Sequence, residues 1–97
     1  MAVICGEFRI TKAEMVSGQR FGWLVRPRQI AFYLACRLSG HSLPVIGRTF
    51  GGKDHTTVLH ARRKIAKMIS LDLDFAEKVK VLEEKCLDAA AFERACE

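Results

Sequence analysis

A regular alternation of apolar and polar positions runs through the second half of the chain. From about Asp54 to Ile69, one stripe at helical spacing is apolar and the opposite stripe is polar or cationic. The apolar stripe contains Val58, Ile65 and Ile69, with Ala61, Arg62 and Met68 at its margins, and the opposite stripe contains Thr56, His60, Arg63 and Lys67, with Lys64 beside it. This pattern predicts an amphipathic helix with a cationic front, which is suited to an anionic partner.

The residues before this helix predict a tight turn and a second, shorter helix. The pair Gly51-Gly52 is typical of a turn. Ser42 can cap a helix that has Pro44 in its first turn and ends before Gly51. Residues 42–69 therefore have the order helix, turn, helix that is typical of a helix-turn-helix.

Three further helices are predicted, two before this unit and one after it. Thr11 followed by Glu14 is a capping-box pattern, which predicts a short helix ending near Gly18. A helix should begin at Pro27 and end near Leu38. Asp72 or Asp74 should cap a last helix at about 72–90, and its inner face contains Phe75, Val79, Leu82 and Cys86. The prediction is a single all-α domain of about five helices over residues 1–97, without a strand.

The charge is distributed unevenly along the 97 residues, whose formal net charge is +5. Residues 1–70 carry 12 Lys and Arg against 3 Asp and Glu, whereas residues 71–97 carry 4 against 8. The helix-turn-helix therefore lies in a basic region, which favours an anionic macromolecule such as DNA. The last helix is acidic.

Several chemical sites can be set aside from the sequence. Residues 47–53 spell G-x-x-x-x-G-K, but Asp54 follows where a phosphate-binding loop needs Ser or Thr, and no strand precedes the motif. His55 and His60 are five residues apart, which does not place both on one helical face as a zinc pair. We therefore expect no cofactor, no metal, no small-molecule substrate and no enzymatic activity.

The cysteines, the longest apolar runs and the N-terminus indicate where the protein is located. The four cysteines show no metal-binding spacing and are expected to be reduced thiols. No apolar run approaches the roughly 18 residues of a membrane span, and the N-terminus lacks the pattern of a secretion signal. The expected location is the cytoplasm, in association with the nucleoid and without contact to a membrane.

The cluster from Asp54 to Thr57 has two interpretations. Asp54 could simply cap the helix, with β-branched residues filling the first turn. Alternatively, these residues could contact base edges, because Asp accepts a hydrogen bond from the cytosine amino group and the Thr methyl contacts the thymine methyl. A single acid within a basic surface repels phosphate and is better explained by base recognition. Both roles are compatible.

Three segments together resemble a known family. Residues 51–61, the run 26–31 (Arg-Pro-Arg-Gln-Ile-Ala) and the run 42–47 (Ser-Leu-Pro-Val-Ile-Gly) are similar to the C-terminal DNA-binding domain of the bacterial replication initiator DnaA. The similarity covers about Phe8 to Ile69. It implies a Trp-repressor-like helix-turn-helix fold and binding to duplex DNA at A·T-rich boxes of the TTATCCACA type.

The resemblance also implies roles for individual residues. The residues expected to contact bases in the major groove are Asp54, His55, Thr56 and Thr57, and Arg20 is expected to enter the minor groove. The residues expected to contact the DNA backbone or to support docking are Arg28, Gln29, Leu43, Pro44, Lys53 and His60. The cationic stripe adds Lys64 to this group. For Arg20 and Arg28 the alternative is a solvated surface cation.

The chain departs from the family in the loop at residues 17–25. The family's loop is rich in Lys and Arg, whereas Arg20 is the only cation here and is followed by Phe21 and Trp23. We expect these aromatic side chains to pack on the core. A partner-binding patch and a wedge in a DNA groove are the alternatives.

The expected function is sequence-specific binding of double-stranded DNA at sites similar to DnaA boxes. No ATPase domain precedes the motifs, so a regulator of replication initiation or of transcription is expected rather than an initiator. The alternative is a protein-interaction module with weak affinity for DNA. In that case the acidic last helix or the Phe21 and Trp23 loop would bind the initiator or its regulators.

Overall fold

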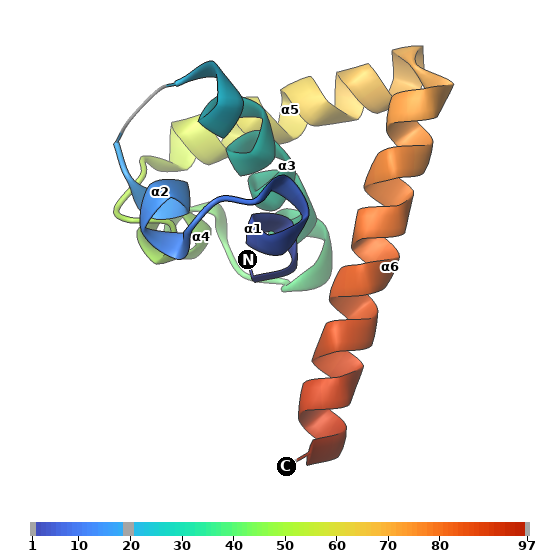
Figure 1. Cartoon of the computed structure of the whole chain (residues 1–97). Helices are drawn as coiled ribbons and strands as arrows, with labels where there is room; N and C mark the ends of the chain where they lie inside the picture. Colours follow the sequence, from blue (N-terminus) through green and yellow to red (C-terminus); the bar gives the residue numbers. More distant parts are fainter. Residues whose placement is uncertain (1, 19–20, 97) are drawn as a thin grey trace.

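All regular elements of the described chain are helices. The computed structural model describes the backbone of residues 2–18 and 21–96 and the side chains of residues 3–18 and 21–88. In these ranges the helices are α1 (Ala2–Phe8), α2 (Lys12–Val16), α3 (Gly22–Leu38), α4 (Leu43–Thr49), α5 (His55–Leu71) and α6 (Leu73–Cys96) (Figure 1). The predicted all-α fold is confirmed. The additional element is α1, which was not predicted from the sequence.

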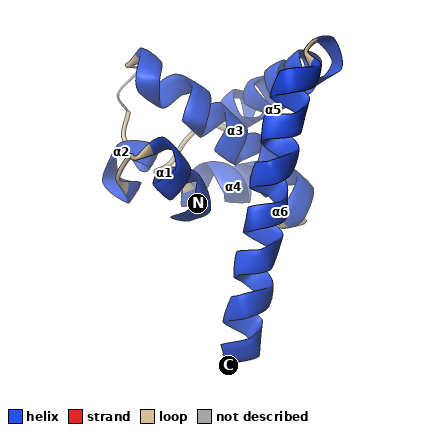
Figure 2. Cartoon of the chain, turned by 45° about the vertical axis from the view of Figure 1, so that its right-hand side comes forward, coloured by secondary structure: helices blue, strands red, loops and turns tan. Residues whose placement is uncertain are grey.

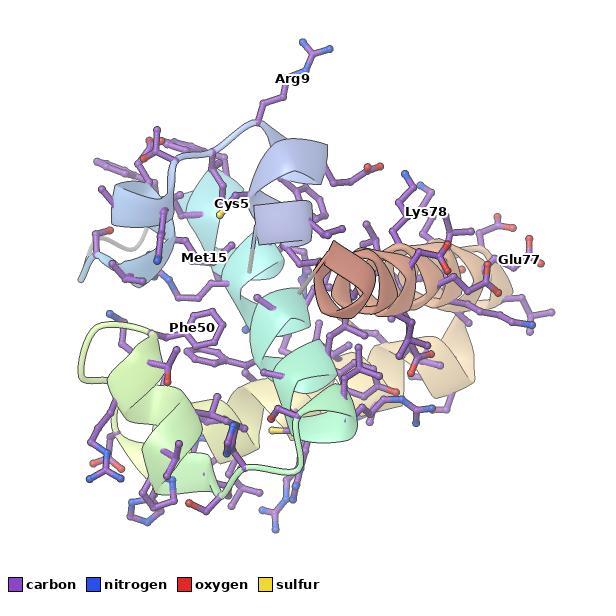
Figure 3. The ribbon with its side chains drawn as sticks, turned by 90° about the horizontal axis from the view of Figure 1, so that it is seen from below. Cys5, Arg9, Met15, Phe50, Glu77 and Lys78 are labelled. Atoms are coloured by element: carbon purple, nitrogen blue, oxygen red, sulfur yellow. The ribbon has the colours of Figure 1, made fainter. Side chains whose placement is uncertain are left out.

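Helix α3 is the central element, because it packs against each of the other five helices. Every helix contributes to one apolar core, in which the rings of Phe32 and Phe50 pack at a centroid distance of 4.7 Å. Met15 and Phe50 point into the body, whereas Arg9 points away from it (Figure 3). The buried apolar residues are Ile4, Cys5, Ile10, Met15, Leu24, Ile30, Ala31, Phe32, Leu34, Ile46, Phe50, Val58, Ala61, Ile65, Val79 and Leu82.

The start of α3 differs from the prediction. The helix begins at Gly22, so Pro27 lies within it rather than in its first turn. Proline removes one hydrogen bond from the interior of a helix. Burial of Leu24, which is 0% exposed, favours continuing the helix through this additional turn. Arg28 and Gln29 are consequently in the body of α3, and the predicted position in a first helical turn is wrong.

The predicted helix-turn-helix is formed by α4 and α5. Ser42 occupies the N-cap position of α4, although its side chain makes no capping hydrogen bond. The backbone of Gly51 and Gly52 has positive φ angles of 87° and 78°, which glycine adopts without strain. A Cβ atom at Gly47 would overlap the carbonyl oxygen of Lys53. The glycines that mimic a phosphate-binding loop are therefore required by the turn and by close packing of α4.

Helix α6 crosses α5, α3 and α1 and then extends past the body of the molecule (Figures 1 and 2). The side chain of Asp72 accepts a hydrogen bond from the Phe75 amide at 3.2 Å, which confirms one of the two predicted caps. Of the predicted inner face, Val79 and Leu82 are buried and Phe75 and Cys86 are partly buried against the core. None of the described helices is long and apolar enough to span a membrane.

Two ion pairs at the surface join α6 to the rest of the molecule. The Arg37 Nε atom donates to the Glu83 carboxylate at 2.7 Å, and the Lys85 Nζ atom donates to the Glu7 carboxylate at 3.0 Å. These pairs connect α6 to α3 and α1. The helix continues to Cys96, beyond the end expected near residue 90.

Candidate nucleic-acid interface

The N-terminus of α5 is organised around the carboxylate of Asp54. Its Oδ1 atom accepts from the Thr56 amide and from the Thr56 hydroxyl, both at 2.9 Å, and lies 3.1 Å from Nδ1 of His55. The amide and hydroxyl hydrogen bonds to Thr56 hold the pKa of Asp54 below its ordinary value. The predicted capping role is present, and it engages only one of the two carboxylate oxygens.

The remaining surface of this first turn is open to a partner. Asp54, His55, Thr56 and Thr57 are all exposed, and 64% of the Asp54 side chain is accessible. These four residues project from the end of a 17-residue helix whose other side is held in the core by Val58, Ala61 and Ile65. An exposed helix start on a rigid support is the arrangement that helix-turn-helix proteins insert into the major groove.

A groove of about 640 Å³ runs between α3 and α5, next to this first turn. We call it the basic groove, because three of its lining residues are cationic and none is acidic. It is lined by Gly18, Val25, Arg28, Gln29, Phe32, Gly51, Gly52, Lys53, Thr57, His60, Ala61 and Lys64. Six of the residues predicted from sequence therefore share one surface. Leu43 and Pro44 are in the first turn of α4, outside this lining.

The Arg28 side chain lines the basic groove but is almost completely buried. It is 7% exposed, and its Nε atom donates to the carbonyl of Met15 at 2.9 Å. One of its terminal nitrogens donates to the carbonyl of Glu14 at 3.0 Å. Burial lowers the pKa of Arg28 from its usual value. The solvated surface cation considered from the sequence is thus wrong for this residue.

The Lys53 side chain also donates a hydrogen bond to a carbonyl at the end of α2. Its Nζ atom donates to the carbonyl of Val16 at 2.8 Å, while its backbone amide donates to the carbonyl of Gly47 at 2.8 Å. Burial lowers the pKa of Lys53, and the neighbouring charge of Arg28 lowers it further. Arg28 and Lys53 therefore anchor the C-terminal carbonyls of α2 to α3 and to the turn, and place two positive charges under the groove.

The other predicted residues divide into exposed and supporting groups. His60 and Lys64 are exposed on the front of α5. Gln29 is partly buried, and its side-chain oxygen accepts from Arg26 at 3.0 Å. Arg20 lies outside the described residues. Gly18 and Val25 carry no sequence signal for this surface, and their contribution to the groove follows only from the packing of α2 and α3.

The two aromatic residues of the 17–25 loop do not pack on the core as expected. Phe21 and Trp23 are 52% and 55% exposed, and their rings stack on each other. The reason is the earlier start of α3, which buries Leu24 and directs its neighbours on the first turn outward.

Comparison with known proteins shows which family this helical domain belongs to. Residues 1–65 match the family described as bacterial dnaA protein helix-turn-helix. The chain belongs to this family. The match includes every helix from α1 to α4, most of α5 and all residues that line the basic groove. Family membership agrees with the helix-turn-helix that α4 and α5 form.

Full-length relatives carry the DnaA name. The chromosomal replication initiator protein DnaA of Xanthobacter autotrophicus is 46% identical over 89 residues, which are 92% of this chain and 18% of that protein. The DnaA proteins of Nitrobacter hamburgensis and Brucella abortus are 45% identical over 83 residues and 42% identical over 89 residues. These matches cover 86% and 92% of the chain, which spans 18% of the length of each relative.

The basic groove and the first turn of α5, as far as the structure describes them, contain no arrangement typical of a metal centre. Among the described side chains, no group of three His, Cys, Asp or Glu residues is placed to hold a metal ion. The chemistry that this surface offers is hydrogen bonding, positive charge and apolar contact.

Proposed function

We propose that this chain binds double-stranded DNA in a sequence-specific way at sites similar to DnaA boxes, and that it thereby regulates replication initiation or transcription. The observation that carries the proposal is the position of the basic groove directly beside the exposed first turn of α5. A phosphate backbone in the groove would bring the first turn to the base edges of the adjacent major groove.

Base recognition is assigned to the first turn of α5. Oδ1 of Asp54 is engaged by Thr56, which leaves Oδ2 for the amino group of a cytosine. The methyl groups of Thr56 and Thr57 suit thymine, and the exposed imidazole of His55 can donate to or accept from a base edge. Because Asp54 already accepts two hydrogen bonds from Thr56 and lies 3.1 Å from Nδ1 of His55, this recognition surface is ordered before DNA binds.

Phosphate contacts are assigned to the walls and floor of the basic groove. Lys64 and His60 on α5 face Gln29 on α3 across it, and each can donate to a phosphate oxygen. Lys53 and Arg28 act from below by fixing the turn and by raising the local positive potential. Leu43 and Pro44 would support docking at the start of α4, and Arg20 would reach the minor groove.

The direct test is fluorescence anisotropy of an end-labelled duplex carrying a DnaA box, compared with a duplex of scrambled sequence. We expect tighter binding to the box and a slope of log affinity against log salt of about −4, from ~0.9 per phosphate and four to five phosphates. Equal affinity for the two duplexes, or a slope near zero, would contradict the proposal.

A second candidate function is a protein-interaction module, and it is favoured by α6. This helix belongs to the acidic segment 71–97, and it keeps Val81 and Leu87 about half exposed (48% and 52%). The module would bind the replication initiator or one of its regulators. Sedimentation of the purified chain with full-length initiator in the absence of DNA separates the two functions, because co-sedimentation together with no box preference supports the module.

A further inference from the structure

Two groups of exposed apolar side chains lie at the end of the molecule opposite the C-terminus. The first is the aromatic pair, Phe21 and Trp23, at the start of α3, where the two residues are 52% and 55% exposed. The second is the leucine corner, Leu71 and Leu73, at the junction of α5 and α6, where the two residues are 76% and 84% exposed. Both segments are at the top of the molecule in Figures 1 and 2, so the two groups belong to one side of it.

The aromatic pair faces away from the basic groove. Val25 lines that groove, and Trp23 precedes it by two positions, which is about 200° around a helix. The rings of Phe21 and Trp23 stack on each other, with centroids 6.0 Å apart and planes that differ by 4°. Stacking restricts the movement of both rings. The pair is therefore an ordered apolar surface that does not belong to the basic groove.

The leucine corner lies outside the apolar core of the described residues. Leu73 precedes Phe75, on the inner face of α6, by two positions and so points away from that face. Leu71 lies off the stripe of α5 that contains Val58 and Ile65. The two leucines are the most exposed large apolar side chains of the described residues. Packing within one copy of the chain does not account for them.

The two groups differ in charge. Helix α3 has no acidic residue in its first turn and no side-chain cap, so the positive end of its dipole is next to the aromatic pair. The leucine corner carries the exposed carboxylates of Asp72 and Asp74. An apolar surface at a positive helix end is complementary to an apolar surface flanked by carboxylates. Each group therefore fits the other better than it fits a second copy of itself.

We propose that this end of the molecule is a self-association surface, on which the aromatic pair of one copy packs against the leucine corner of a second copy. Because both groups lie on the same side of the chain, a two-fold axis lets the second copy return the same contact, as in an isologous dimer. This surface is separate from the basic groove. The inference therefore goes beyond the proposed function and does not depend on it.

The exposed area of the two groups sets the expected strength of this dimer. The four side chains expose about 500 Å² per copy, from roughly 150–250 Å² for a large side chain and their exposed fractions. Two copies would bury about 1,000 Å² in total, which is at the lower limit of specific interfaces. The dimer should therefore be weak and reversible.

The direct test is sedimentation equilibrium of the full chain without DNA, at concentrations up to about 1 mM, where weak interfaces still associate. A reducing buffer keeps the four cysteines from cross-linking copies. We expect the weight-average mass to rise with concentration from the monomer value of 10.9 kDa toward twice that value. A constant monomer mass would overturn the inference. A mass that continues past the dimer would replace the two-fold dimer by an open chain of copies and would also overturn it.

Three substitutions of exposed apolar residues locate the interface. Trp23→Ser and Leu73→Ser should each raise the dissociation constant of the dimer about tenfold or more, because each removes an apolar contact twice from a two-fold interface. Leu87→Ser removes a leucine that is 52% exposed in the second half of α6 and should leave the dimer unchanged. All three variants should keep the melting temperature of the parent. Self-association that survives the first two substitutions, or that falls equally in Leu87→Ser, would contradict the proposed surface.

A mixture of Trp23→Ser and Leu73→Ser distinguishes the proposed pairing from contacts between like groups. Each variant alone loses both copies of the contact between Trp23 and Leu73. A dimer of one variant with the other keeps one complete contact. We expect the equimolar mixture to associate more tightly than either variant alone. A mixture that associates no more tightly than the separate variants would overturn the pairing, and because no DNA is present, the proposed function would be unaffected.

Discussion

At the scale of single residues, the carboxylate of Asp54 caps the helix with one oxygen and remains exposed to a partner. Oδ1 satisfies the amide and hydroxyl of Thr56, which is the usual task of an N-cap. The side chain is nevertheless 64% exposed. A group that is fixed by the helix and still accessible can recognise a base without first being ordered, so the capping and base-contacting roles do not compete.

Substitution of Asp54 by Asn and by Ala should separate these roles. Asn caps helices about as well as Asp, so Asp54→Asn should keep the parent melting temperature but change the preferred base pair at one or two positions of the box. Asp54→Ala should lose the preference and also melt about 5 °C lower. The checks are thermal denaturation and binding to a set of single-base-pair variants of the box. An unchanged base preference in Asp54→Asn would limit Asp54 to capping.

The lowered pKa of Asp54 gives this prediction a pH dependence. A depressed carboxylate pKa contributes stability above the ordinary value, near 4, and that stability is lost as the pH falls through the pKa of the folded state. The difference in melting temperature between the parent and Asp54→Ala should therefore be full at neutral pH and should become smaller as the pH falls below the ordinary carboxylate pKa.

Lys53 and Lys64 offer a second comparison, between an anchoring cation and an exposed one. Lys53→Met removes the hydrogen bond to the carbonyl of Val16 and should lower the free energy of unfolding by about 1 kcal/mol. Lys64→Met should leave stability unchanged and make the salt slope of DNA binding shallower by about one. Urea denaturation and salt-dependent anisotropy measure the two effects. Unchanged stability of Lys53→Met would mean that this anchor is not needed for the fold.

At the scale of the elements, the turn between α4 and α5 depends on direct contact between main chains. Gly47 on α4 leaves room for the carbonyl of Lys53, whose amide donates back to the carbonyl of Gly47. Gly51 leaves room in the same way for the carbonyl of Val16. The angle at which α5 leaves the body is thus set by backbone atoms, which cannot rotate away as a side chain can.

Gly47→Ala should therefore be severely destabilising. The added methyl group would overlap a main-chain oxygen, and overpacking of this kind costs about 1–3 kcal/mol or more. Gly6→Ala is the matched control, because Gly6 lies in α1 with nothing within 4 Å of an added Cβ atom, and it should be neutral or slightly stabilising. Denaturant unfolding of both variants checks the prediction. Similar stabilities would show that α4 can shift without cost.

The elements also show what sequence reasoning can and cannot provide. The capping box of Thr11 and Glu14 forms with both of its hydrogen bonds, and the helices of the helix-turn-helix lie where the apolar period placed them. The start of α3 was missed because a local rule for proline was outweighed by burial of Leu24. The burial of Arg28 was missed because its acceptors are carbonyls 13 and 14 residues away, and sequence patterns do not register main-chain acceptors.

At the scale of the whole molecule, the basic groove lies entirely within the region matched to the DnaA family. If the chain recognises the same boxes as the initiator, the two proteins should exclude each other, because one major-groove site cannot hold two recognition helices. Footprinting of full-length initiator while this chain is added should show loss of initiator protection at shared boxes. Unchanged protection, with both proteins recovered as a complex without DNA, would reject competition and support the protein-interaction module.

The course of α6 has a practical consequence for anything attached to the C-terminus. The helix carries that end of the chain away from the body (Figure 1), and its described contacts with the core end at Cys86. A dye, a surface linker or a second DNA-binding module joined there would be separated from the body by the helical segment that follows Cys86. Two copies joined through this end could reach separate boxes, and the spacing of those boxes would then govern how tightly the pair holds DNA.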